Sequence, residues 1–147
     1  MPPAIAQFWN KLNANEKMVM YGAIIAVVAF LLGAVGGGGY FGSGSGDLIA
    51  AIIVTVIYWL KYGPNKINWP APPQTIVLVV AGIAAIFAIL ALLGWISFIG
   101  ISLFSLAILL NAVGCGIMAY GAWKEYQAMP KTTAAPPSSS PPAPPAA

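Results

Sequence analysis

The sequence predicts an all-α integral membrane protein with four transmembrane helices arranged as two hairpins. Three observations predict this fold class. Of the 147 residues, 60% are apolar and only 6% are charged, so there is too little polar surface to cover a soluble globule of this length. Every charged residue lies outside four long apolar runs. The lysines lie only before the first run, between the second and third runs, and after the fourth run. Two helical hairpins bring these three segments to the same side of a membrane.

The N-terminal segment, residues 1–15, is predicted to form a short amphipathic helix on the membrane surface. Its apolar side chains recur at helical spacing, at Ile5, Phe8, Trp9 and Leu12. Asn13 is then the expected N-cap of the next helix, with Glu16 at the capping-box position. A frayed terminus is the simpler alternative for this segment. A secretory signal peptide that includes the first apolar run is a further alternative.

The transmembrane domain, residues 16–127, is predicted to contain spans at about residues 18–35, 47–62, 75–94 and 99–123. The first, third and fourth apolar runs reach roughly 27, 29 and 37 Å, and the hydrocarbon core of a bilayer is about 30 Å thick. The second run is shorter. Counted from Asp47 as N-cap to Tyr62 it reaches about 24 Å, and Lys61 can extend it by snorkelling. A re-entrant or interfacial helix there would instead give three spans and divide the lysines between two compartments.

The lysines set the expected orientation. Two precede the first span, two lie between the second and third, and two follow the fourth: Lys11, Lys17, Lys61, Lys66, Lys124 and Lys131. The positive-inside rule assigns these segments, and with them both termini, to the cytoplasm. We expect the membrane to be a plasma membrane of the bacterial type.

Two segments outside the spans have a composition typical of mobile chain. The loop of residues 36–46 has seven glycines among its eleven residues, and we expect it to be a flexible loop on the outer side. Residues 128–147 are rich in Pro, Ala and Ser, which cannot bury a core. We expect them to form a disordered cytoplasmic tail.

The sequence contains few residues that could act in catalysis or bind a metal. The chain has no histidine and no arginine, and the absence of histidine removes the commonest general base and a common metal ligand. Glu16, Glu125 and Asp47 lie beside predicted membrane boundaries and are predicted to be interfacial charges. Cys115, inside the fourth span, is predicted to be an inert packing residue. The sequence therefore predicts no catalytic residue, no metal, no cofactor and no nucleic-acid partner, and we expect the protein not to be an enzyme.

Small residues recur along two of the predicted spans. In the first span they form one stripe, and in the fourth they recur on one face: Gly22, Ala26, Ala29 and Gly33, then Ala107, Gly114 and Gly121. Ala112 and Gly116 form a second pair on the fourth span. Such stripes let two helix backbones approach closely in lipid, where van der Waals contact drives association. They can close the four-helix bundle itself, or they can form an interface with another chain.

Asn111 is the one strongly polar side chain near the middle of a predicted span. An unpaired amide in hydrocarbon would cost several kcal/mol, so we expect Asn111 to find a hydrogen-bond partner. The candidate partners are Thr55, Ser105, a backbone carbonyl, or Asn111 of another copy. Asn111 would then hold helices together or line a polar path.

These features predict a small non-catalytic membrane protein that acts as a structural, assembly or accessory subunit through helix packing. Its expected partners are the lipid bilayer and either further copies of itself or other membrane protein subunits. One alternative is a small channel or permease for a neutral or small solute, with Asn111, Thr55 and Ser105 along its path. A further alternative is a holin-like or membrane-shaping protein, which the small size and high apolar content favour.

Overall fold

The computed structural model describes residues 1–36, 45–98 and 100–130, and within these ranges the chain is all-helical, without a strand. The helices are α1 (Pro3–Lys11), α2 (Ala14–Val35), α4 (Ser45–Lys61), α5 (Pro73–Trp95) and α6 (Leu103–Ala128), with a short 3-10 helix η1 (Ile96–Phe98). Three of them, α2, α5 and α6, are long and apolar enough to cross a membrane. The predicted flexible loop and C-terminal tail lie largely outside the described residues.

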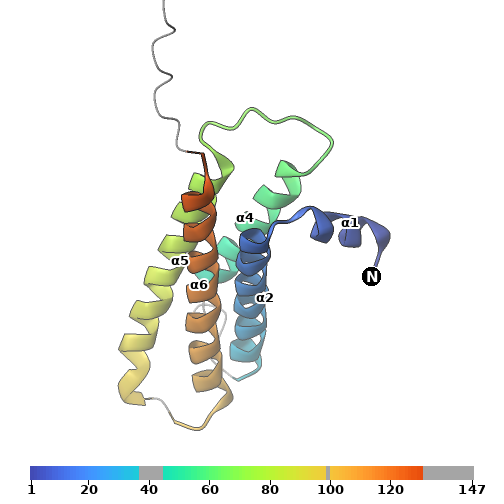
Figure 1. The fold of residues 1–147 in the computed structure, drawn as a ribbon. Helices are drawn as coiled ribbons and strands as arrows, with labels where there is room; N and C mark the ends of the chain where they lie inside the picture. Colours follow the sequence, from blue (N-terminus) through green and yellow to red (C-terminus); the bar gives the residue numbers. More distant parts are fainter. Residues whose placement is uncertain (37–44, 99, 131–147) are drawn as a thin grey trace, which may run out of the picture.

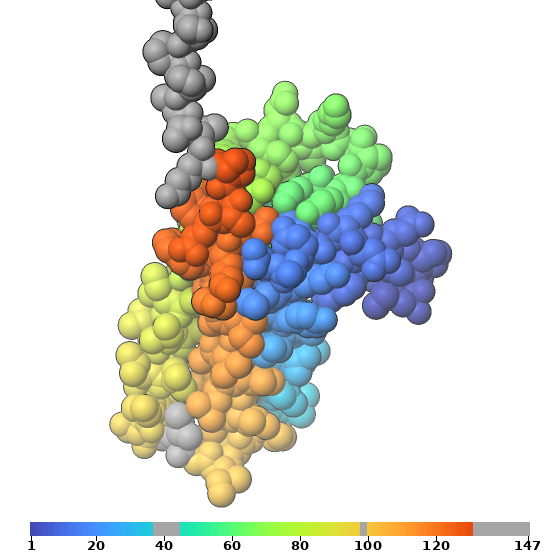
Figure 2. All heavy atoms as spheres, in the orientation of Figure 1, coloured from blue at the N-terminus to red at the C-terminus, as the bar shows by residue number. Residues whose placement is uncertain are grey.

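The four long helices pack side by side, and each contacts two neighbours (Figure 1). Helix α2 lies against α6 and α4, and α5 lies against α4 and α6. The first residues of α2 and α5 and the last residues of α4 and α6 share one end, where Lys17, Lys61 and Lys124 also lie. We call it the lysine end. Helix α1 projects sideways from this end (Figures 1 and 2). Helix α4 begins well short of the opposite end (Figure 1).

The interior between these helices is built mainly from small residues. Ten of the buried apolar residues are alanines: Ala23, Ala26, Ala29, Ala50, Ala51, Ala81, Ala84, Ala88, Ala107 and Ala122. The predicted glycine stripes of α2 and α6 face each other. A Cβ atom added at Gly22 would lie 2.4 Å from the backbone nitrogen of Met118, and one added at Gly114 would lie 2.9 Å from that of Ala26. The two backbones are therefore in direct contact, and Gly22, Ala26, Ala29, Gly33, Gly114 and Gly121 are all buried within the chain.

The outer surface of the same helices is apolar. On α5 the large exposed apolar side chains are Val79, Ile83, Ile86, Phe87, Ile89, Leu90, Leu93 and Trp95. Large apolar side chains therefore face outwards while alanine and glycine face inwards, the reverse of a soluble helical protein. This distribution fits helices that are surrounded by lipid.

The helix boundaries follow local capping chemistry. The predicted capping box is confirmed: the Asn13 side chain accepts a hydrogen bond from the Glu16 backbone, and the Glu16 side chain accepts one from the Asn13 backbone. The predicted start of the last helix at residue 99 is wrong. Helix α6 begins at Leu103 because the Ser102 side chain caps it by accepting from the Ser105 backbone nitrogen, and it continues to Ala128.

Candidate functional site

The lysine end contains a buried polar cluster centred on Glu16, whose side chain is fully buried. One Glu16 oxygen, Oε1, lies 2.5 Å from Lys61 Nζ, and the other, Oε2, accepts a hydrogen bond of 2.6 Å from the Tyr62 hydroxyl. Oε2 also accepts from the backbone nitrogen of Asn13 at 2.9 Å. The Glu16 carboxylate therefore joins the start of α2 to the end of α4.

A second buried carboxylate extends this cluster to α6. The Asn13 side-chain amide donates to both carboxylate oxygens of Glu125, at 3.1 and 2.9 Å. Lys61 Nζ lies 3.9 Å from Glu125 Oε1. Two buried glutamates thus share one lysine, and the residues Asn13, Glu16, Lys61, Tyr62 and Glu125 tie three helices together. We call these five residues the lysine-end clamp.

Two tyrosine hydroxyls, that of Tyr62 in the clamp and that of Tyr58 beside it, have different surroundings. Burial, followed by the hydrogen bond to the Glu16 carboxylate, raises the pKa of the Tyr62 hydroxyl above its ordinary value, so this hydroxyl remains a hydrogen-bond donor. Tyr58 is fully buried near the same carboxylates, yet its hydroxyl has no hydrogen-bond partner among the described residues. The Tyr62 hydroxyl therefore takes part in the clamp, whereas the Tyr58 hydroxyl is unpaired among the described residues.

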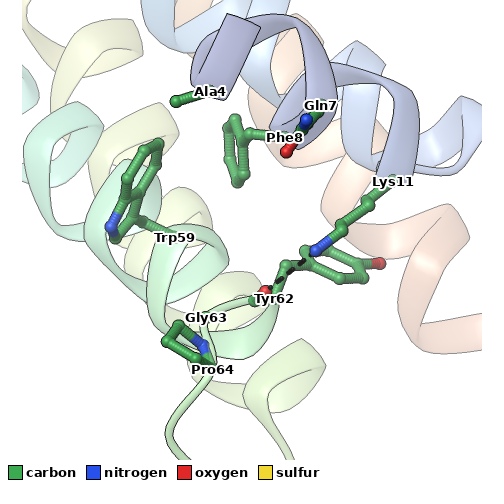
Figure 3. A pocket seen from close by; sticks show the side chains of 8 residues that line it. All are labelled: Ala4, Gln7, Phe8, Lys11, Trp59, Tyr62, Gly63 and Pro64. Carbon is green, nitrogen blue, oxygen red and sulfur yellow. Dashed lines mark hydrogen bonds between the residues drawn. The ribbon is translucent and has the colours of Figure 1, made fainter.

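A shallow groove lies between α1 and the end of α4 at the same end of the molecule (Figure 3). It has a volume of about 160 Å³, and its lining includes the rings of Phe8 and Trp59, which are 5.2 Å apart between centroids. Lys11 reaches across it and donates to the Tyr62 carbonyl at 3.5 Å. The groove therefore combines aromatic rings with one ammonium group, and α1 meets the end of α4 there through the Phe8–Trp59 ring contact and the Lys11 hydrogen bond.

A separate polar contact lies inside the helical core, away from the lysine end. The Asn111 side-chain amide on α6 donates to Asp47 Oδ2 on α4 at 2.5 Å. Both residues are buried, with exposed fractions of 7% and 5%. The Cys115 thiol, one turn along α6, lies 3.9 Å from Asn111 Oδ1. The partner of Asn111 is thus Asp47, which the sequence reasoning did not include among its candidates.

The other two predicted polar-path residues lie elsewhere. The Thr55 hydroxyl donates to the Ala51 carbonyl of its own helix at 2.8 Å, and Thr55 lines an apolar groove between α2 and α4. The Ser105 hydroxyl accepts from the Gly100 backbone nitrogen at 3.3 Å, within the cap of α6. Asn111, Thr55 and Ser105 are therefore not brought together in one place.

The three acidic residues that were predicted to be interfacial charges, Glu16, Asp47 and Glu125, are all buried within the chain, with exposed fractions of 0, 5 and 6%. The structure corrects the expectation that Lys61 snorkels to the headgroups, because its ammonium turns to Glu16. Glu16 and Lys61 are 45 residues apart, so no local spacing in the sequence could have signalled this pair. Within the described residues, no group of three or more Cys, Asp or Glu side chains could hold a metal ion.

No protein-family model, curated protein or solved structure matches the chain. The functional interpretation therefore rests on the geometry of the chain alone.

Proposed function

We propose that the chain is a four-span membrane protein that acts without catalysis, as an assembly or accessory subunit that binds other membrane helices. In this proposal α2, α4, α5 and α6 form a transmembrane four-helix bundle. Helix α4, with 17 residues, is the shortest span, at about 25 Å. The lysine end faces the cytoplasm, and α1 lies in the membrane surface beside it, as the positive-inside rule and its aromatic side chains favour.

The observation that carries this proposal is a small-residue face on the outside of α6. Gly116 is exposed, and a Cβ atom added there would meet nothing within 4 Å. Ala112, one turn earlier, is half-buried. This pair has the small-xxx-small spacing at which a second helix can approach closely in lipid. The buried glycines of α6 already contact α2, so Ala112 and Gly116 form a small-residue pair on α6 that remains open to a partner, and a second copy of the chain is the simplest one.

The packed interior supports a role in assembly over a role in permeation. Glycine and alanine on α2 and α6 bring the two backbones into contact, which leaves no room for a solute between them. The three residues proposed for a neutral path, Asn111, Thr55 and Ser105, make separate local contacts. A small channel or permease remains the second candidate, but this arrangement favours it less.

The proposal is tested by the oligomeric state of the Gly116→Leu variant in lipid nanodiscs and in mild detergent. We expect the wild-type chain to form a defined oligomer or a complex with a co-purified membrane protein. A leucine at position 116 keeps the partner backbone away, and we expect it to weaken association at least about tenfold, equivalent to about 1.4 kcal/mol.

The matched control is Gly82→Leu on α5, because a Cβ atom at Gly82 also meets nothing within 4 Å. This variant should assemble like the wild type. A wild-type chain that is strictly monomeric in lipid, or a Gly116→Leu variant that assembles normally, would contradict the proposal.

A further inference from the structure

The Asp47 carboxyl lies deep within the helical core. Its partner Asn111 is eight residues inside the start of α6 at Leu103, which corresponds to about 12 Å along the helix axis. On α5, the facing residue Phe87 is eight residues before the end at Trp95, again about 12 Å. Asp47 lies at this depth because the first residues of α4 lie nearer the middle of the bundle than the ends of the neighbouring helices (Figure 1).

In a membrane this depth would lie within hydrocarbon. Helices α5 and α6 are about 35 and 39 Å long, and the hydrocarbon core is about 30 Å thick, so about 2 to 5 Å of each helix end projects beyond it when the helices are centred in the bilayer. Asp47 would then lie several Å below the headgroups. An acidic side chain at such a depth is costly as an anion unless a cation accompanies it, and such residues are commonly functional.

The groups around Asp47 do not supply that cation. On α6 it meets the Asn111 amide and, beside it, the Cys115 thiol. On α5 the side chains lining the neighbouring groove are the apolar Val80, Ile83, Ala84 and Phe87. Among the described residues no lysine forms an ion pair with Asp47, since both recorded ion pairs belong to Lys61 at the other end of α4.

A groove leads from the surface to this carboxyl. It has a volume of about 280 Å³ between α4 and α5, and Asp47 is the one charged residue in its lining. The rim is formed by side chains that are 41 to 64% exposed: Ile49, Ile53, Ile83 and Phe87. Asp47 can therefore be reached from the lipid-facing side of the molecule by an apolar reagent.

We propose that Asp47, held by Asn111, is a proton-binding carboxyl group embedded in the membrane and open to the bilayer through the groove between α4 and α5. The Asn111 amide donates to one carboxyl oxygen and fixes its orientation in either protonation state. Proton uptake removes a buried charge, and proton release restores it. The site would couple the packing of α4 against α5 and α6 to proton availability. This inference rests on the membrane setting proposed above, but not on assembly through Gly116.

A hydrophobic carbodiimide tests the proposal in native membranes that contain the full chain. The reagent takes the proton of a carboxylic acid on one nitrogen while the carboxyl oxygen adds to its central carbon, and the adduct rearranges to a stable acylurea with no atom lost. We expect the adduct on the peptide that carries Asp47. Above the pKa the protonated fraction falls tenfold per pH unit, so we expect the adduct to fall at least about tenfold between about pH 6 and about pH 9.

Peptides carrying Glu16 and Glu125 are internal controls, because both carboxylates are buried beside Lys61. They should remain unlabelled, and Asp47→Asn should remove the adduct. Because the labelled position is read directly in the wild-type chain, the result does not depend on whether the variant folds. Labelling of the glutamates in place of Asp47, no labelling of Asp47, or labelling that does not change with pH would overturn the proposal. A monomeric chain that still labels at Asp47 would contradict the assembly role alone.

Discussion

At the scale of single residues, breaking the ion pair of the lysine-end clamp costs more free energy than forming it contributes to stability. Glu16, Glu125 and Lys61 are buried or nearly so, and removing one partner of a buried ion pair typically costs about 3–5 kcal/mol because the other charge is left uncompensated. The net gain from forming the pair is much smaller, since both charges lose their hydration. The hydrogen bonds from Asn13 and Tyr62 satisfy the remaining carboxylate oxygens, and they make burial of two acids tolerable.

Tyr62, which belongs to the clamp, and Tyr58, which lies beside it, provide a matched test of how these hydrogen bonds offset burial. We predict that Tyr62→Phe lowers the free energy of unfolding by about 1.5–3 kcal/mol, because it removes a hydrogen bond to a charged group. We predict that Tyr58→Phe is neutral or slightly stabilising, because its hydroxyl is buried without a partner in the part of the chain that the structure describes. Unfolding in mixed detergent micelles, followed by circular dichroism, measures both variants. A loss above about 1 kcal/mol for Tyr58→Phe would mean that its hydroxyl is satisfied after all.

Sequence reasoning could find contacts at this scale only where they are local. The capping box of Asn13 and Glu16 depends on a three-residue spacing, and it was predicted correctly. The pairs formed by Glu16 with Lys61 and by Asp47 with Asn111 join residues 45 and 64 positions apart, and they depend on the tilt and offset of whole helices. Asp47 was interpreted as a surface cap because it begins an apolar run, and nothing nearby signals that α4 starts deep in the core.

At the scale of elements, the small-residue stripes decide which helices are neighbours. Gly22, Gly114 and Gly121 each place a backbone atom of the facing helix within about 3 Å of a hypothetical Cβ atom. Helix α2 therefore packs most extensively on α6, although the two are farthest apart in the sequence. The stripes could be predicted from the spacing of glycine and alanine. Their partner could not, because any helix with a small-residue face would satisfy the same requirement.

Because α2 and α6 are in backbone contact, we predict that adding a single methyl group between them lowers the free energy of unfolding. Gly22→Ala would place its Cβ atom 2.4 Å from the Met118 backbone nitrogen, so the two helices must separate. We expect a loss of about 1–3 kcal/mol in the free energy of unfolding, the usual range for overpacking, measured as a lower unfolding temperature in detergent.

Gly82→Ala is the control for this substitution, because its added methyl group meets nothing within 4 Å and alanine favours a helix over glycine. We expect that variant to be unchanged or stabilised by up to about 1 kcal/mol. Equal unfolding temperatures for the Gly22 and Gly82 variants would show that the backbones of α2 and α6 are not in contact.

At the scale of the whole molecule, composition and the placement of charged residues were enough to predict the coarse architecture, but not the number of spans. An all-helical chain with three helices apolar enough to span a membrane follows from long uncharged runs bounded by Lys, Pro and Gly. The position of α4 was harder to predict. Its 17 residues are few for a span, and its lysine end is held by Glu16 whether or not its other end reaches the far side.

The side of the membrane on which each end of α4 lies gives a direct test of the proposed topology. We predict that the cysteines introduced by Ser43→Cys and Pro64→Cys, which flank α4, react with a membrane-impermeant maleimide from opposite faces of sealed vesicles. Position 64 should react only in inside-out vesicles, because Lys61 and Lys66 favour a cytoplasmic position for its segment. The wild-type chain is the control, since its one cysteine, Cys115, is buried. Reaction of both positions from the same face would make α4 a re-entrant helix, and it would leave Asp47 in a three-span protein.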